Sequence, residues 1–170
     1  MLRSELDPPD DRTAAYWSER WRRLVDERRV QVERLQGQGP QTNYWDKRAG
    51  QFHRMTGTQA ADQDPLVVLL KELVKGGSAL DVGAGVGRYT VPLASAADRV
   101  TAVEPSEGMR SFLVASIADR RLTNVTVVPS TWEDSVVEPH DVVIASHILY
   151  PIADVVPFVQ KLDAHARQHC

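Results

Sequence analysis

Three closely spaced glycines, followed at a distance by an acidic residue, are the residues best placed to do chemistry. Gly83, Gly85 and Gly87 come directly after the mostly apolar run 79–82. Glycines permit a tight turn and let a ligand approach the backbone, and a helix that begins after them presents free N–H groups. Such a loop can hold a nucleotide phosphate or the carboxylate of an amino-acid-like cofactor.

The spacing of the glycines argues against a dinucleotide site. The dinucleotide fingerprint is G-x-G-x-x-G/A, and counting from Gly83 its third small residue would be Arg88. The long cationic side chain of Arg88 would obstruct close packing of the helix on the strand, and the third glycine comes one residue early, at Gly87. A Walker phosphate loop is excluded more firmly, because no G-K-[ST] follows.

The acidic partner is Glu104, which comes 21 residues after Gly83 at the end of the next apolar run. A carboxylate at the tip of the second strand is well placed to accept both hydroxyls of a ribose. Either feature alone is a weak signal, whereas the order strand, glycine loop, helix, strand, glutamate is fairly specific. The alternative is a glycine turn with an unrelated surface glutamate in another doubly wound protein.

The elements that must position these residues alternate in type from residue 78 onward. Short β-branched runs are separated by helical stretches, the pattern of βαβ units and a parallel sheet. We expect strands over 79–82, 100–103, 125–128 and 141–145. We expect helices over 14–36, 43–52, 65–75, 87–96, 106–119 and 153–168. The predicted fold class is therefore α/β, a Rossmann-like doubly wound and mostly parallel sheet.

A helical extension precedes this core. Residues 1–13 are interpreted as a loose arm, and residues 14–36 place apolar residues at helical spacing opposite a face of mixed arginines and acids. The glycines and proline of 37–40 should end that helix. The predicted division is an arm with an amphipathic helix over residues 1–40 and a core over residues 41–170.

The motifs resemble those of the class I S-adenosylmethionine-dependent methyltransferases, particularly the small-molecule type. Residues 80–87 look like the first motif of that family, and residues 103–106 look like the second. Residues 127–134 are similar to its third-strand motif, and residues 140–147 to its fourth strand, which ends beside the methyl donor. The resemblance covers roughly residues 43–165 and implies a sheet order of 3-2-1-4.

The resemblance implies S-adenosyl-L-methionine as the cofactor and S-adenosyl-L-homocysteine as its product. Glu104 would hold the ribose, and the residues after it would flank the adenine. The family often has aspartate where Thr131 stands, so a backbone contact from Trp132 would remain but a carboxylate contact would not. The implied cofactor-binding residues are Tyr44, Asp81, Gly83, Ala84, Gly85, Gly87, Glu104, Pro105, Met109, Thr131, Trp132, Glu133 and Ser146.

Aromatic residues before the core have two interpretations. Tyr44, Trp45 and Phe52 could form a lid over the methionine end of the cofactor, as an N-terminal helix does in related enzymes. They could also simply pack their helix on the sheet. Tyr89, directly after the glycine loop, is open to the same two interpretations.

The acceptor should lie at the end of the fourth strand, because ligands of open α/β sheets bind outside the carboxyl ends of strands. That places Ser146, His147 and Tyr150 near the reaction centre. Methyl transfer is an in-line displacement, so the protein mainly aligns the nucleophile with the methyl group. His147 and Tyr150 are the candidate catalytic residues, and His147 could act as a base near neutral pH or only shape the pocket.

Composition and charge narrow the partners. The 170 residues are 42% hydrophobic and 25% charged, with a net charge of −3, which is ordinary for a globular protein and not typical of a polyanion binder. No run approaches the roughly 18–20 apolar residues that span a bilayer. The resemblance implies a small-molecule acceptor, and the charge and the lack of a long apolar run favour neither a nucleic acid nor a membrane as a partner. We expect no metal, because the histidines show no metal-site spacing with cysteine or acidic residues. The single cysteine, Cys170, fits a cytoplasmic protein.

The length predicts an incomplete core, because the family fold has three strands beyond the four found here. The fourth strand would then be an open edge. A fragment, a truncated gene product or a sheet completed by partner chains would each explain this, the fragment most simply. A homodimer could form through helix 14–36 or through that edge. The alternatives to an active enzyme are a non-catalytic cofactor-binding or oligomerisation protein that keeps the fold and, less favoured, an NAD-dependent oxidoreductase.

Overall fold

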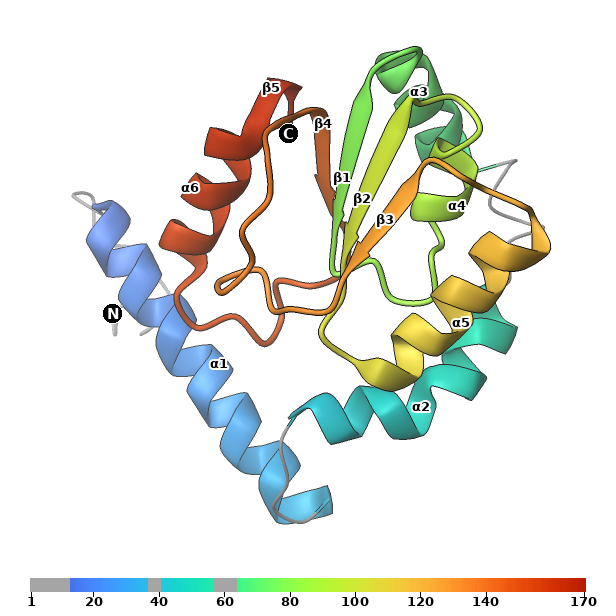
Figure 1. The fold of residues 1–170 in the computed structure, drawn as a ribbon. Helices are drawn as coiled ribbons and strands as arrows, with labels where there is room; N and C mark the ends of the chain where they lie inside the picture. Colours follow the sequence, from blue (N-terminus) through green and yellow to red (C-terminus); the bar gives the residue numbers. More distant parts are fainter. Residues whose placement is uncertain (1–12, 37–40, 57–63) are drawn as a thin grey trace, which may run out of the picture.

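A five-stranded parallel sheet organises the computed structural model, which describes residues 13–36, 41–56 and 64–170 (Figure 1). The strands are β1 (Ser78–Val82), β2 (Arg99–Val103), β3 (Val125–Val128), β4 (His140–Ala145) and β5 (Ala166–His169). The helices are α1 (Ala14–Gln36), α2 (Gln41–Thr56), α3 (Pro65–Val74), α4 (Thr90–Leu93), α5 (Glu107–Asp119) and α6 (Val155–His165). All neighbouring strands pair in parallel, which confirms the predicted α/β, doubly wound fold.

The fifth strand corrects the prediction for the end of the chain. The pattern predicts one helix over 153–168, whereas α6 ends at His165 and the chain continues as β5. β5 pairs with β4, so the sheet order is β3-β2-β1-β4-β5 and β4 is not an edge strand. Three of the four β5 residues are exposed and polar. The sequence of this edge strand therefore lacks the alternation of apolar and polar residues that distinguishes a strand from the end of a helix.

Two helices differ in length from the expectation. The helix after the glycine loop is expected over 87–96, but α4 has four residues because the chain turns through three glycines of positive φ first. α2 has 16 residues, more than the predicted 43–52. The expected helix stop at 37–40 and most of the expected arm over 1–13 lie outside the described residues.

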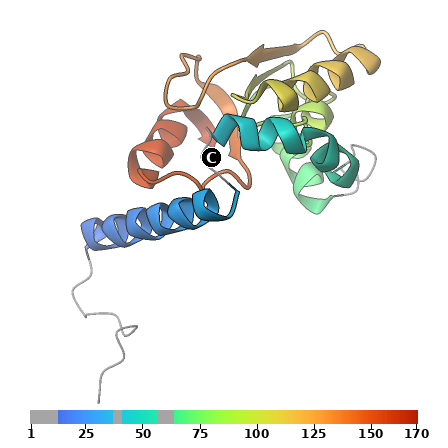
Figure 2. The ribbon, with the colours of Figure 1, turned by 90° about the horizontal axis from the view of Figure 1, so that it is seen from below.

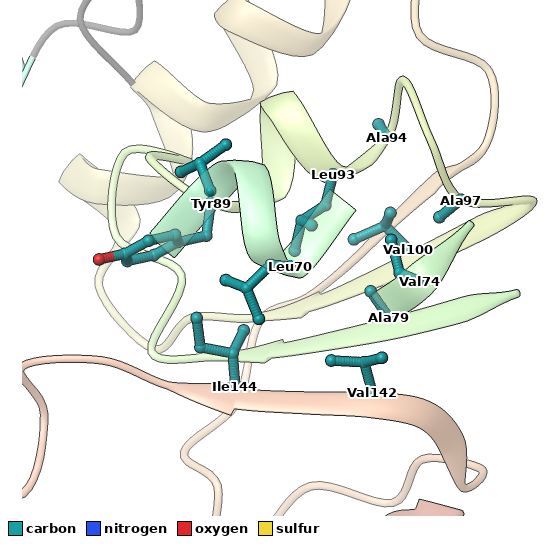
Figure 3. Packing of buried hydrophobic residues seen from close by; sticks show 11 residues of the cluster. Leu70, Val74, Ala79, Tyr89, Leu93, Ala94, Ala97, Val100, Val142 and Ile144 are labelled. Atoms are coloured by element: carbon teal, nitrogen blue, oxygen red, sulfur yellow. The ribbon is translucent and has the colours of Figure 1, made fainter. Parts of the chain in front are cut away.

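Helices cover both faces of the sheet. α3, α4 and α5 lie on one side and α6 on the other (Figure 1). Because successive residues of a strand point to opposite faces, Ala79 of β1 enters the core under α3 and Leu80 enters the core under α6. Figure 3 shows the first of these cores, where Leu70 of α3 lies near Ile144 of β4 and Val74 of α3 lies near Ala79 of β1.

α1 is attached to the rest of the molecule mainly beside α6 (Figures 1 and 2). The Trp21 indole N–H donates to the Ile152 carbonyl at 2.7 Å, and Arg22 pairs with Asp154 at 2.6 Å. Within α1 the buried hydrophobic residue is Val25, while three others of the predicted apolar face stay 48%, 53% and 78% exposed, namely Trp17, Leu24 and Leu35. None of the helices in the described part of the chain has the length and apolar character needed to cross a membrane.

Substitutions at Gly76 and Gly87 allow the cost of backbone strain to be measured separately from the cost of side-chain crowding. Their φ angles are +67° and +91°, but a Cβ on Gly87 would lie 2.6 Å from Leu113 Cδ1, whereas one on Gly76 would meet nothing within 4 Å. We expect Gly76→Ala to lower the free energy of unfolding by about 1–2 kcal/mol through left-handed strain. Gly87→Ala should cost about 1–3 kcal/mol more through overpacking. Urea denaturation measures both, and equal losses would contradict the crowding at Gly87.

Candidate functional site

The loop after β1 turns back over the end of β2. The N–H groups of Gly83 and Ala84 both donate to the Val103 carbonyl, at 2.8 and 3.1 Å. Gly83, Gly85 and Gly87 have φ angles of +71°, +57° and +91°, a region that other L-residues rarely adopt. The conformation therefore favours glycine at each of the three predicted positions.

Glu104 joins the loop after β1 to the loop after β2. Its side chain is buried, its Oε2 accepts from the Gly85 N–H at 2.8 Å, and its Oε1 accepts from the Ser106 N–H at 2.8 Å. Burial raises the pKa of Glu104, while the two N–H donors act in the opposite direction. A carboxylate offers about four acceptor positions, so about two remain. The structure thus brings the predicted acid and the predicted glycine loop into direct contact.

The chain that follows Glu104 is fixed at the start of α5. Ser106 is the N-cap of α5, and its hydroxyl accepts from the Met109 N–H at 3.2 Å. Arg110 Nη1 donates to the carbonyls of Glu104 and Pro105 at 3.0 and 2.5 Å. Sequence reasoning missed the roles of Ser106 and Arg110, although a serine before a helix is a recognisable cap signal.

The side chain of Asp81 is buried against the start of α4. It is 2% exposed, and its Oδ2 accepts from the Thr90 hydroxyl at 2.6 Å and the Thr90 N–H at 3.0 Å. Burial raises the pKa of Asp81 to about 6, against the opposing effect of the two Thr90 bonds, and the charge of Glu104 raises it further. Asp81 therefore holds β1 to the first turn of α4.

Arg88 does not stand at the position where the chain after the glycine loop packs most closely, which is Gly87. Its guanidinium leaves the strand–helix junction and pairs with Asp64, the N-cap of α3, at 2.8 Å. Gly87 comes one residue earlier than the third small residue of the dinucleotide fingerprint. Its missing Cβ leaves room for Leu113 of α5.

The end of β4 carries the predicted acceptor-side residues. The Ser146 hydroxyl lies 3.2 Å from the Tyr89 hydroxyl, which extends from the buried ring shown in Figure 3. His147 has a φ of +58°, uncommon for a residue other than glycine. His147 Nδ1 lies 3.1 Å from the Tyr150 hydroxyl, and both side chains are exposed. The structure therefore brings the two candidate catalytic residues together.

Ile148 connects this end of β4 to the glycine loop. A Cβ on Gly83 would collide with Ile148 Cγ2, so the isoleucine side chain fills the space beside the first glycine. Sequence reasoning did not single out Ile148, because an apolar residue after a strand carries no signal of its own. The same contact means that the two loops cannot change independently.

The turn after β3 points its tryptophan into the core. Trp132 is 3% exposed, and its indole N–H donates to the Phe158 carbonyl at 3.3 Å. The Thr131 hydroxyl closes the turn by bonding to Asp134. Lys161 Nζ donates to three carbonyls of the turn, those of Trp132, Glu133 and Ser135. Trp132 can therefore face a ligand only through its backbone.

α2 lies beside α5 at the end of the molecule where the strands reach their carboxyl ends (Figures 1 and 2). Phe52 Cε1 is 3.9 Å from the Cβ position of Gly85. Tyr44 instead packs its ring under the Arg48 guanidinium, 4.2 Å away, and against Trp45. Of the three predicted aromatic residues, Phe52 is the one that lies next to the glycine loop.

A groove of about 590 Å³ lies elsewhere, against β2 and β3. Its lining consists of Arg99, Thr101, Thr126, Val128, Val136, Val137, Glu138, His140 and Arg167. None of the predicted site residues contributes to it, so the candidate site is assigned by its glycines and carboxylates and not by cavity size. Within the described ranges, no group of three or more His, Cys, Asp or Glu side chains is arranged to hold a metal ion.

A family profile described as a methyltransferase domain matches residues 79–168, more than half of the chain. The chain belongs to this methyltransferase family. The matched segment begins in β1 and ends in β5, so it contains the glycine loop, Glu104 and the end of β4. It does not contain α1, α2 or α3.

Solved structures share the fold. The complex of DhpI with SAH is 24% identical over 74% of this chain and 62% of that one, with a TM-score of 0.59. Magnesium protoporphyrin IX methyltransferase from Synechocystis PCC 6803, with bound SAH, is 22% identical over 67% and 53%, with a TM-score of 0.55. The chain thus spans less than two thirds of either protein, and at these identities the likeness shows the fold alone. No curated protein matches the sequence.

The raised pKa of Asp81 predicts a pH-dependent cost to stability. Its pKa is about 6 in the folded state, against the ordinary value of 3.8 for an aspartate. The folded state therefore binds the proton more tightly and loses stability as pH rises through that interval. Asp81→Asn removes this loss. Between pH 4.5 and 7.5 we expect the stability of the variant relative to the wild type to improve by about 2 kcal/mol. Urea denaturation at both pH values tests this, and a pH-independent difference would contradict it.

Proposed function

We propose that this chain binds S-adenosyl-L-methionine and supplies the cofactor-binding part of a methyltransferase that acts on a small molecule. The observation that carries the proposal is the Glu104 carboxylate, buried at the end of β2 and bonded to Gly85 of the loop after β1. The family to which residues 79–168 belong supports it. The presence of SAH in the DhpI and magnesium protoporphyrin IX methyltransferase structures supports the cofactor.

The residues fit this cofactor. A Cβ on Gly85 would meet Phe52 and the Gly83 carbonyl only at 3.9 and 4.0 Å, so the loop backbone is open to a close approach there. Glu104 keeps acceptor positions for the two ribose hydroxyls. Both features lie outside the carboxyl ends of β1 and β2, where open α/β sheets bind ligands.

Each residue then has a defined task. S-adenosyl-L-methionine supplies, when bound, a methyl group on a positively charged sulfur. Glu104 orients the ribose, Gly85 lets the cofactor approach the backbone, and Asp81 keeps the loop in place through Thr90. The adenine would lie between Pro105 and Met109 on one side and the backbone of the turn after β3 on the other. The remaining proposed contacts are Tyr44, Gly83, Ala84, Gly87, Thr131, Trp132, Glu133 and Ser146.

The acceptor side is proposed at the end of β4. His147 can take the proton that the acceptor loses. Alternatively, Tyr150 can take that proton while it passes its own hydroxyl proton to His147 Nδ1 across their 3.1 Å contact. A small-molecule acceptor is supported by the net charge of −3, which is unfavourable for binding a nucleic acid, and by the fold shared with a magnesium protoporphyrin IX methyltransferase.

The proposal also includes the organisation of the chain. We propose a division into residues 1–40 and 41–170 and a cytoplasmic location. We also propose a homodimer through helix 14–36, which is supported by the exposed side chains of Trp17, Leu24 and Leu35.

Calorimetry tests the cofactor assignment. The wild type should bind S-adenosylmethionine and S-adenosylhomocysteine but not NAD. Glu104→Ala should weaken binding by about 1.5–3 kcal/mol, or roughly 10- to 100-fold, because a charge-assisted contact to the ribose is lost. Glu107→Ala is the matched control, since Glu107 is exposed in the first turn of α5 and carries the same charge.

Three outcomes would contradict the assignment. Tight binding of NAD would favour the oxidoreductase alternative. A wild type that binds neither sulfur compound would remove the cofactor. An unchanged affinity in a folded Glu104→Ala protein, checked by circular dichroism, would remove Glu104 from the site.

A further inference from the structure

The start of α5 is bonded to a second carboxylate, which comes from α2. Asp46 Oδ1 accepts from the Ser106 hydroxyl at 2.6 Å and from the Gly108 N–H at 2.9 Å. These two donors, the hydroxyl first, lower the pKa of Asp46. A negative charge is also favoured at the N-terminus of a helix. We call these two hydrogen bonds the Asp46 contact.

Gly108 indicates the same contact independently of hydrogen bonding. A Cβ on Gly108 would lie 2.8 Å from Asp46 Cα and 2.9 Å from the Asp46 carbonyl oxygen. These are backbone atoms, which cannot rotate out of the way as the end of a side chain can. Gly108 is in the first turn of α5 and has no positive φ that would itself call for glycine. The close approach of α2 is therefore the reason for glycine at this position.

Ser106 links the Asp46 contact to the cofactor site. Its N–H donates to Glu104 Oε1 at 2.8 Å, while its hydroxyl donates to Asp46. Glu104 in turn accepts from Gly85. A continuous series of hydrogen bonds thus runs from α2 to the glycine loop, and Phe52 of the same helix reaches that loop directly, 3.9 Å from the Gly85 Cβ position.

We propose that Asp46 is a positioning residue for cofactor binding, acting through Ser106 on Glu104 and holding Phe52 beside Gly85. The inference rests on the proposed function. Ala49 of α2 would still pack against Met109 of α5. Loss of the Asp46 contact would nevertheless loosen α2 at the start of α5, release the Ser106 hydroxyl and leave the Glu104 carboxylate less firmly oriented. The expected result is weaker cofactor binding without any change to a residue that touches the cofactor.

Asp46→Ala and Gly108→Ala break the contact from opposite sides. The first removes the acceptor oxygens, and the second inserts a methyl group against the α2 backbone. We expect each to weaken S-adenosylhomocysteine binding by 10-fold or more in calorimetry and to speed amide hydrogen exchange in α2. Asp46→Asn should give an intermediate affinity, because its amide oxygen can accept the same two hydrogen bonds without the charge.

Gly50→Ala is the matched glycine control. It lies in α2 itself, and its Cβ would meet Phe112 and Arg54 only at ordinary distances of 3.7 and 3.8 Å. It should bind S-adenosylhomocysteine like the wild type. A further readout separates positioning from general stability: S-adenosylhomocysteine should slow exchange of the α2 amides in the wild type, and this slowing should shrink in Asp46→Ala.

The outcomes distinguish the inference from the proposed function. If the wild type binds S-adenosylhomocysteine and both Asp46→Ala and Gly108→Ala bind it equally well, the positioning role is overturned while the proposed function stands. If the ligand slows α2 exchange equally in the wild type and Asp46→Ala, the positioning role is likewise overturned. A wild type that binds neither sulfur compound overturns the proposed function and the inference with it.

Discussion

The carboxylate of Glu104 holds together two loops that leave the sheet in succession, and the arrangement of the site depends on it. Each oxygen accepts one backbone N–H, from Gly85 after β1 and from Ser106 after β2. This is possible only because β1 and β2 are parallel neighbours whose ends are in register, Val82 opposite Val103. Burial makes the charged carboxylate costly unless donors surround it, so the two loops and the acid stabilise one another. With one donor on each oxygen, the carboxylate keeps about two of its acceptor positions.

The sequence predicted the structure correctly where a short local pattern is typical of a single conformation. The closely spaced Gly83, Gly85 and Gly87 predicted a tight turn, and Glu104 was recognisable as the acid at the end of the next apolar run. Prediction failed where pairing or packing decides: the polar residues of β5 carry no strand period, and only the neighbouring β4 makes them a strand. The ion pair of Arg88 was not predicted, because its partner, Asp64, lies 24 residues away. Asp46 gave no signal at all, since its contact to Ser106 joins residues 60 apart.

The family match and the proposed site do not have the same boundaries. Residues 79–168 contain the glycine loop and Glu104, but α2 lies before them and contacts both the start of α5 and Gly85. On the opposite side of the sheet, Lys161 of α6 fixes the turn after β3 through three carbonyls. Ordinary buried contacts, distant in sequence, therefore set the shape of a site whose chemical residues are recognisable from short motifs.

The packing of Ile148 against Gly83 limits how the loop after β4 can change in evolution. Its side chain occupies the space that a Cβ on Gly83 would need, so the loop after β4 rests on the loop after β1. In the proposed function the first of these loops faces the acceptor and the second faces the methyl donor. A larger residue at position 148 would press on the donor loop, and a smaller one would leave a gap beside it. Evolution of acceptor specificity through this loop is therefore constrained at position 148 by packing against Gly83, in addition to any constraint from the chemistry of the acceptor side.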